Sequence, residues 1–386
     1  MAVTVAFVNL STSTSVTIFN NNQNGMPLPF TSPPNSLCIL RLSAIGDICH
    51  TLPVVRTIQQ AWPQTRLTWI IGKSEYSLLE GIPDIEFIVF DKSHGLSAYR
   101  EVRRQLRSRR FDALLHMQMS LRSSLLSLLV NTPIKLGFDR ARAGDLQWLF
   151  TNHKIAAQQR QHVLDSLFGF SQALGINQRL LRWDIPVPSQ DRQKAEQLAN
   201  PAQPYLVISP SSSKPYRNWH IEGYAQLADY AASHYGLHVY ITGGNTELEQ
   251  KLAREICSRT SNDQITSLIG KTSLKQLLVV LENAIAVISP DSGPAHMATT
   301  VGTPVIGLYA CTNAERARPY TSAEWTINHY PEAVENKYHK TVAELPWGIR
   351  VRDSGTMDRI TVEEVKSTLD NLIQTTGKIT NKRSQP

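Results

Sequence analysis

The feature that most constrains this fold is a repeated alternation of short apolar runs with stretches of helical periodicity. Strand-like runs occur at 37–42, 67–72, 85–90 and 112–117, and again at 205–208, 238–242, 286–288 and 304–309. Helical stretches lie between them, at 47–62, 97–109, 221–234, 246–259 and 273–283. Strands that alternate with helices predict a parallel sheet covered by helices on both faces. The sequence therefore predicts an α/β fold.

The alternation is interrupted once, around 183–204, by a polar stretch with four prolines that reads as a linker. A chain of 386 residues is long enough for two domains of ordinary size. We expect an N-terminal domain over 37–190, a second domain over 191–360, and a C-terminal helix with a polar tail over 361–386. Residues 1–36 lack the basic start and apolar centre of a secretory signal and are predicted to be a disordered extension.

Cysteine spacing and charge narrow the classes of protein. The four cysteines, at 38, 49, 257 and 311, show no Cys-x-x-Cys spacing, which predicts reduced thiols in a cytoplasmic protein without a zinc site. The net charge is +7, and six arginines cluster within 100–110. Such a run is most often a solvated helix face. It can also attract nucleic acid, an acidic membrane or an acidic glycolipid, and charge alone does not choose among them.

Three loops that follow predicted strands carry the candidate site residues. Ligands of parallel sheets bind outside the carboxyl ends of the strands, and two such domains place a site in the cleft between them. Asp47 follows the first strand near a helix start, where it can cap the helix or accept a proton from a hydroxyl. The Ser-rich turn 209–214 and Arg217 precede a helix and can hold an anion.

The third loop, Asp291-Ser292-Gly293-Pro294-Ala295-His296, gives the strongest signal. A strand stops at Asp291, Gly293 permits close approach of a ligand to the backbone, and a helix follows. The alternative is that Asp291 and Ser292 only cap that helix. Gly-x-Gly-x-x-Gly, the P-loop pattern and Asp-x-Asp are all absent, which argues against a dinucleotide oxidoreductase, a P-loop kinase and a carboxylate-held metal at a diphosphate.

Two motifs together resemble glycosyltransferase family 9, the ADP-heptose heptosyltransferases. Residues 41–53 (RLSAIGDICHTLP) resemble its opening motif, and residues 291–296 (DSGPAH) resemble its nucleotide-sugar motif. The resemblance covers about residues 37–320. It implies a GT-B fold, with two Rossmann-like doubly wound domains facing a central cleft, and metal-independent transfer with inversion and no cofactor.

The resemblance also assigns roles to individual residues. Asp47 would be the catalytic base, and Arg217, where the family usually has Lys, would stabilise the leaving diphosphate. The other implied donor-binding residues are Ser212, Ser213, Glu247, Thr272, Asp291, Ser292, Gly293 and His296, and the acceptor-binding residues are Arg41, Ser43, Gly46 and Arg122.

The implied substrates are ADP-heptose and an acidic glycolipid of the lipopolysaccharide inner core. The basic cluster would contact that glycolipid or hold the protein peripherally on the cytosolic face of the inner membrane. Alternatives are a transferase of the same fold with another nucleotide sugar or acceptor, and a non-catalytic nucleotide-sugar-binding protein. A nucleic-acid partner is not expected, because neither aromatic platforms nor a recognition helix is evident.

Overall fold

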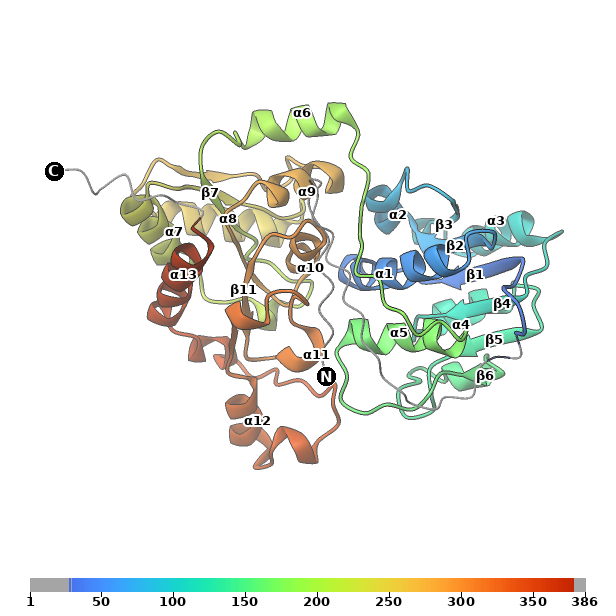
Figure 1. Cartoon of the computed structure of the whole chain (residues 1–386). Helices are drawn as coiled ribbons and strands as arrows, with labels where there is room; N and C mark the ends of the chain where they lie inside the picture. The colour runs from blue at the N-terminus through green and yellow to red at the C-terminus, as the bar shows by residue number, and fades with distance from the viewer. Residues whose placement is uncertain (1–27, 29, 378–386) are drawn as a thin grey trace, which may run out of the picture.

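Two six-stranded parallel sheets, each covered by helices, form the body of the molecule (Figure 1). The structure is a computed structural model that describes residue 28 and residues 30–377. The first sheet is built from residues 36–154 and the second from residues 205–328. We call these two parts the first and second lobes.

The first sheet has the strand order β3-β2-β1-β4-β5-β6. Its strands are β1 Ser36–Leu40, β2 Arg66–Gly72, β3 Ile85–Phe90, β4 Ala113–His116, β5 Ile134–Gly137 and β6 His153–Lys154. Its helices are α1 Ile45–Ala61, α2 Lys73–Leu79, α3 Leu96–Leu106, α4 Leu121–Ser127 and α5 Val163–Ala173.

Alternate residues of β1 pack on opposite faces of this sheet, as the pleat of a strand requires. Leu37 and Ile39 join a core with α1 and α5, whereas Cys38 and Leu40 join a core with α3 and α4. Because both faces are covered, β1 reads as a continuous apolar run rather than an alternating one. The face that carries α1 is directed toward the second lobe, since α1 packs on α10 of that lobe.

The second sheet has the order β12-β11-β10-β7-β8-β9. Its strands are β7 Tyr205–Ile208, β8 His238–Ile241, β9 Ile265–Ser267, β10 Val287–Pro290, β11 Val305–Tyr309 and β12 Thr326–Asn328. Its helices are α7 Ile221–Tyr235, α8 Glu247–Arg259, α9 Leu274–Glu282, α10 Gly293–Thr300, α11 Ala314–Ala317, α12 Tyr330–Tyr338 and α13 Val362–Thr376. In each sheet the strand order reverses beside the first strand, between β1 and β4 and between β7 and β10. A ligand of a parallel sheet is expected at such a point.

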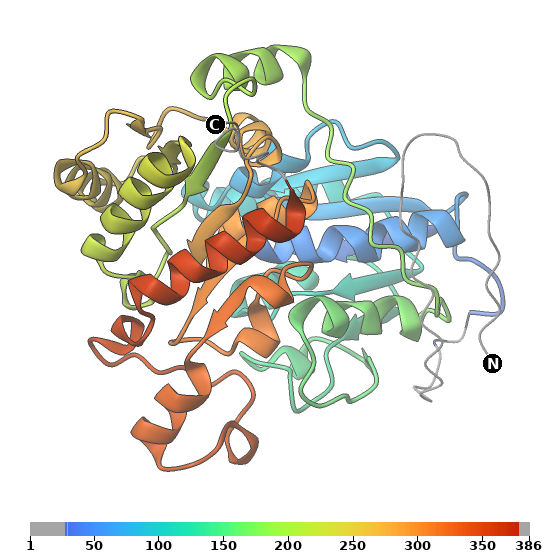
Figure 2. The same ribbon diagram turned by 60° about the vertical axis from the view of Figure 1, so that its left-hand side comes forward.

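The segment that connects the two lobes contains the helix α6, Ser189–Leu198, which packs along α9 (Figure 2). The sequence predicted only a linker over 183–204. The α6 segment is polar, with Ala195 as its single buried residue, so it shows little of the apolar periodicity that identifies a helix.

The predicted α/β architecture is confirmed, and the observed strands begin and end within two residues of the predicted ones. Four short strands that the sequence did not reveal, β5, β6, β9 and β12, extend the edges of the sheets. Most of the predicted N-terminal extension lies outside the described residues. Within it, the Leu28 amide donates to the carbonyl of Ala173 at 2.8 Å, and Leu28 is buried. In the described part of the chain no helix is long and apolar enough to span a membrane.

Candidate active site between the two lobes

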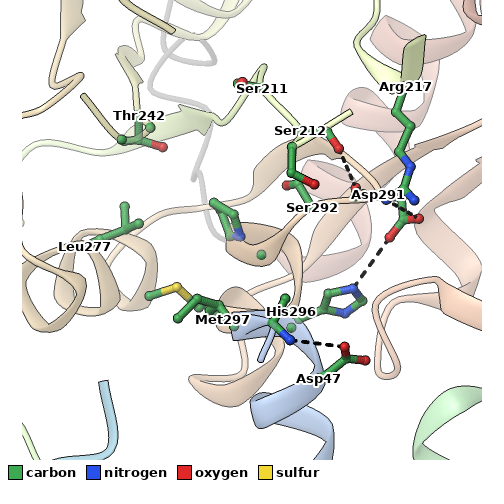
Figure 3. Close-up of a pocket in the computed structure, with 18 of the residues that line it drawn as sticks. Asp47, Ser211, Ser212, Arg217, Thr242, Leu277, Asp291, Ser292, His296 and Met297 are labelled. Atoms are coloured by element: carbon green, nitrogen blue, oxygen red, sulfur yellow. Dashed lines mark hydrogen bonds and ion pairs between the residues drawn. The ribbon is translucent and has the colours of Figure 1, made fainter. Parts of the chain in front are cut away.

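A cavity of about 890 Å³ lies between the lobes, at the carboxyl ends of β1, β7, β8 and β10. The first lobe contributes the start of α1, and the second contributes the loops after β7, β8 and β10 together with the start of α10 (Figure 3). Ten of the predicted site residues line this one cavity: Gly46, Asp47, Ser212, Ser213, Arg217, Thr272, Asp291, Ser292, Gly293 and His296.

Asp47 lies on the first turn of α1, and its orientation is fixed by two contacts. Its Oδ2 accepts a hydrogen bond from the Ala44 amide at 3.2 Å and forms an ion pair with Arg41. Arg41 is buried and also donates to the carbonyls of Ser43 and Met117. The Asp47 side chain is 37% exposed, so it remains accessible from the cavity. A carboxylate at a helix start is also stabilised by the helix dipole.

Asp291 lies at the end of β10 and is held by two basic side chains of its own lobe. Arg217 Nη1 lies 3.0 Å from Asp291 Oδ2, and His296 Nε2 lies 3.8 Å from Oδ1. Burial raises the pKa of this carboxyl, but the nearby His296 ring and Arg217 charge outweigh burial, so the pKa of Asp291 lies below its ordinary value. Asp291 is therefore an anion, and Arg217 is oriented toward the cavity by it.

The start of α10 and the Ser-rich turn form an anion-binding arrangement beside Asp291. Ser212 Oγ donates to the Asp291 carbonyl at 3.2 Å, and Ser292 Oγ lies 2.8 Å from Ser289 Oγ. The free amides at the first turn of a helix carry partial positive charge. Together with Arg217, they provide donors suited to phosphate oxygens.

The two lobes are in close contact where Gly46 of α1 meets His296 of α10. A Cβ built on Gly46 would lie 2.4 Å from His296 Cδ2, so only glycine fits here. The His296 ring also packs edge-on against His50 at 4.5 Å between centroids. In the view of Figure 3, His296 lies between the carboxylates of Asp47 and Asp291. The two acids are thus brought to one cavity by the packing of α1 on α10.

Four predicted site residues do not line the cavity. Glu247 is exposed at the first position of α8, whereas Glu249 lines the cavity and accepts from the Gly244 amide at 2.8 Å. Arg41 and Ser43 precede the residues 44–47 that line the cavity, and Arg41 forms an ion pair with Asp47. Arg122 is exposed on the first turn of α4. The arginines of the basic cluster on α3 are likewise absent from the cavity wall.

The structure adds cavity residues that sequence reasoning missed, among them His50, Glu75, Arg316 and Arg350. The Arg316 side chain makes no hydrogen bond or ion pair within the described residues, and burial lowers its pKa. The fields of both Asp47 and Asp291 act on its charge. Arg316 and Arg350 follow β11, and the segment after this strand was not among the three loops predicted to carry the site. Over residues 28 and 30–377, no group of three or more His, Cys, Asp and Glu side chains is arranged to hold a metal ion.

A family model for glycosyltransferase family 9 (heptosyltransferase) matches residues 99–347 of this chain. The lipopolysaccharide core heptosyltransferase OpsX of Haemophilus influenzae is 41% identical over 343 residues, which cover 88% of this chain and 97% of that protein. The chain belongs to glycosyltransferase family 9. It is therefore a glycosyltransferase, as its motifs indicated.

Solved structures of this family share the fold. The family 9 glycosyltransferase from Veillonella parvula superposes with a TM-score of 0.71 at 21% identity, over 88% of this chain and 97% of that one. The Escherichia coli heptosyltransferase WaaC with ADP superposes with a TM-score of 0.67 at 19% identity, over 87% and 99%. The predicted GT-B fold is confirmed by these matches.

Proposed function

We propose that this family 9 glycosyltransferase moves a heptose from ADP-heptose to the inner core of lipopolysaccharide, with inversion at the anomeric carbon and without a metal ion. The single observation that carries the proposal is that Asp47 of one lobe and Asp291 of the other line the same cavity. The name of the Haemophilus influenzae relative supports the choice of a lipopolysaccharide core acceptor. The donor is inferred from the family motif.

In the proposed reaction, an acceptor hydroxyl attacks the anomeric carbon from the face opposite the diphosphate. Asp47 accepts the proton of that hydroxyl as the new C–O bond forms and the bond to the diphosphate breaks. Asp47 suits this role because Arg41 and the Ala44 amide fix it while it still faces the cavity. General-base assistance of this kind contributes typically about 10²–10⁴ in rate.

The leaving nucleoside diphosphate would be bound by the second lobe. Arg217, Ser212 and the amides at the start of α10 supply positive charge and hydrogen-bond donors, which makes a bridging metal unnecessary in this proposal. We propose that Asp291 binds the donor sugar. Thr272 and Glu249 also line the cavity, and we propose that they bind the nucleoside. Arg316 and Arg350 also line the cavity, and we propose that they bind the anionic groups of the acceptor.

The test is transfer of heptose by the purified full chain from ADP-heptose to a lipopolysaccharide inner-core acceptor, with EDTA present. Asp47→Asn should lower kcat by about 10²–10⁴ while leaving the affinity for ADP nearly unchanged. Asp263→Asn, an exposed carboxylate with no contact among the described residues, is the matched control. NMR of the product should show an inverted anomeric configuration.

Three outcomes would contradict parts of the proposal. Transfer only from another nucleotide sugar, or only to another glycan, would replace the substrates. Binding of ADP-heptose without any transfer would favour a non-catalytic binding protein. Loss of activity in EDTA that Mg²⁺ restores would contradict metal independence.

A further inference from the structure

Exposed apolar side chains gather on the first lobe, outside the cavity. Eight large apolar side chains are exposed in the described part of the chain, and seven of them lie between residues 96 and 149. Six of these seven come from α4 with its C-cap residue Leu128 and from the segment 139–149. We call these six the apolar rim: Leu121 54%, Leu125 43%, Leu128 58%, Leu146 56%, Trp148 41% and Leu149 59% exposed.

The rim is built as an unpartnered surface. Leu121, Leu125 and Leu128 are spaced by four and three residues, so they form one stripe along the outer face of α4. Leu126, on the opposite face, is fully buried against the sheet with α3. Since the helix already has a buried face of its own, its second apolar stripe serves no packing need in this lobe.

The positive charge of the protein is concentrated in the same segment. Residues 96–149 contain ten Lys and Arg against four Asp and Glu, a net charge of +6 out of +7 for the whole chain. Arg140 stacks over the Trp148 ring with its guanidinium carbon 4.9 Å from the centroid. The helix α3 covers the same face of the sheet as α4. Arg100 and Arg103 on α3, and Arg107 at its C-cap, are exposed and make no ion pair among the described residues.

Hydrogen bonds connect the rim to residues 42–43, which lead into the loop that presents Asp47. Gln118, three residues before Leu121, accepts from the Leu42 amide at 2.6 Å and donates to Ser43 Oγ at 3.3 Å. Gln147, between Leu146 and Trp148, donates to the Gln118 carbonyl at 3.1 Å. The rim is therefore part of the same rigid edge as the loop that presents Asp47.

We propose that the apolar rim and the arginines around it dock on the surface of an anionic lipid bilayer. Leucine and tryptophan side chains enter the boundary between headgroups and acyl chains, and arginines pair with phosphates above it. Each basic residue near an anionic membrane adds attraction that salt weakens. This inference rests on the proposed function, in which the acceptor is borne by a membrane. Docking of the rim would place the active site beside that acceptor.

The test is co-sedimentation of the full chain with vesicles of phosphatidylcholine alone and with phosphatidylglycerol added. Wild type should bind the anionic vesicles at least about tenfold more tightly than the neutral ones, and high salt should weaken binding. The double variant Leu121→Ser/Trp148→Ser should lose about tenfold or more in anionic-vesicle affinity. Arg122→Glu/Arg140→Glu should do the same, whereas Leu248→Ser and Arg254→Glu, exposed on the second lobe, should bind like wild type.

Vesicle binding and glycosyl transfer are measured separately, so this inference can fail while the proposed function stands, and the reverse. Vesicle binding needs no substrate, and Leu121→Ser/Trp148→Ser should keep its thermal stability and its transfer rate to an acceptor without acyl chains. No binding of wild type to anionic vesicles, or equal binding by the double variants, would overturn the inference. A dimer in sedimentation that Leu121→Ser/Trp148→Ser dissolves, without vesicle binding, would assign the rim to a second copy of this chain and overturn it as well.

Discussion

At the scale of single residues, the two carboxylates of the cavity differ in what surrounds them. Asp291 is enclosed by Arg217 and His296, which hold its pKa below the ordinary value. Asp47 is more exposed and contacts Arg41 and the Ala44 amide. An enclosed carboxylate suits the binding of sugar hydroxyls, and an accessible one suits proton transfer. The assignment of roles in the proposed mechanism follows from this difference.

Arg316 provides a prediction at the scale of single residues. Its guanidinium lines the cavity without a hydrogen-bond or ion-pair partner among the described residues, so its charge is available to an anionic substrate group. Arg316→Gln should raise KM for the acidic acceptor roughly 10–100-fold, because a charge-assisted hydrogen bond is lost. Arg352→Gln, outside this cavity, is the control. Steady-state kinetics with each substrate varied in turn would measure it. A rise in donor KM alone would contradict the acceptor role.

The sequence predicted most of these residues because each follows the carboxyl end of a recognisable strand. It missed Arg316 and Arg350 because both lie well beyond the end of β11, in a segment without a recognised motif. It selected Glu247, but only Glu249 lines the cavity; Thr246 caps α8, and the helical turn then directs Glu249 inward. Which of two acids on one turn points into a site depends on where the helix begins, and that is among the least certain features of a sequence pattern.

At the scale of elements, the contact between α1 and α10 positions the site. Gly46→Ala would place a methyl group 2.4 Å from His296 Cδ2, so the helices must separate or the ring must move. We expect a loss of about 1–3 kcal/mol in the free energy of unfolding, as for other overpacked contacts, and at least about tenfold lower activity. Urea denaturation and transfer assays measure the two effects.

A matched control for this variant exists in the first lobe. At Gly144, an added Cβ would have its nearest neighbour, Met119 Cβ, at 3.7 Å, which is ordinary contact. Gly144→Ala should therefore leave the free energy of unfolding within about 0.5 kcal/mol of wild type. Equal stability of the Gly46→Ala and Gly144→Ala variants would contradict the importance of the α1–α10 contact.

The long central strands were predictable because both their faces are buried, and they read as continuous apolar runs. The edge strands β6, β9 and β12 have two or three residues each, with no fully buried position. Such short and partly exposed segments carry no apolar run. They form because their backbone groups pair with a neighbouring strand. A local sequence pattern does not indicate whether such a neighbour is present.

At the scale of the whole molecule, a buried histidine joins the lobes and makes the fold sensitive to acid. His162 caps α5 by accepting from the Leu164 amide at 3.1 Å, and its other nitrogen donates to the Arg318 carbonyl at 2.9 Å. Burial lowers the pKa of His162 to about 4. The unfolded chain takes up this proton near pH 6.5, so stability falls as the pH drops from about 6.5 to 4, by roughly 3 kcal/mol for this group.

His162→Asn tests this prediction, because asparagine can cap α5 but does not titrate. The variant should lose less of its Tm between pH 7 and pH 5 than wild type does, as measured by differential scanning fluorimetry. His339→Asn, at an exposed left-handed position after α12 where asparagine fits well, should keep the wild-type acid slope. Identical slopes for His162→Asn and wild type would contradict the role of His162.

The two lobes also contact each other on both sides of the cavity, and the two sets of contacts differ in kind. On one side, the Lys275 amine donates to the carbonyls of Glu80 and Pro186, and α2 of the first lobe packs on α9 of the second. On the other side, Trp347 donates to the Gln161 carbonyl at 2.8 Å from one loop to another. Loop contacts open at lower free energy than packed helices. We therefore expect the lobes to open by rotation about a hinge on the α9 side. Amide hydrogens of residues 158–161 and 342–348 should then exchange with solvent sooner than those of residues 275–281.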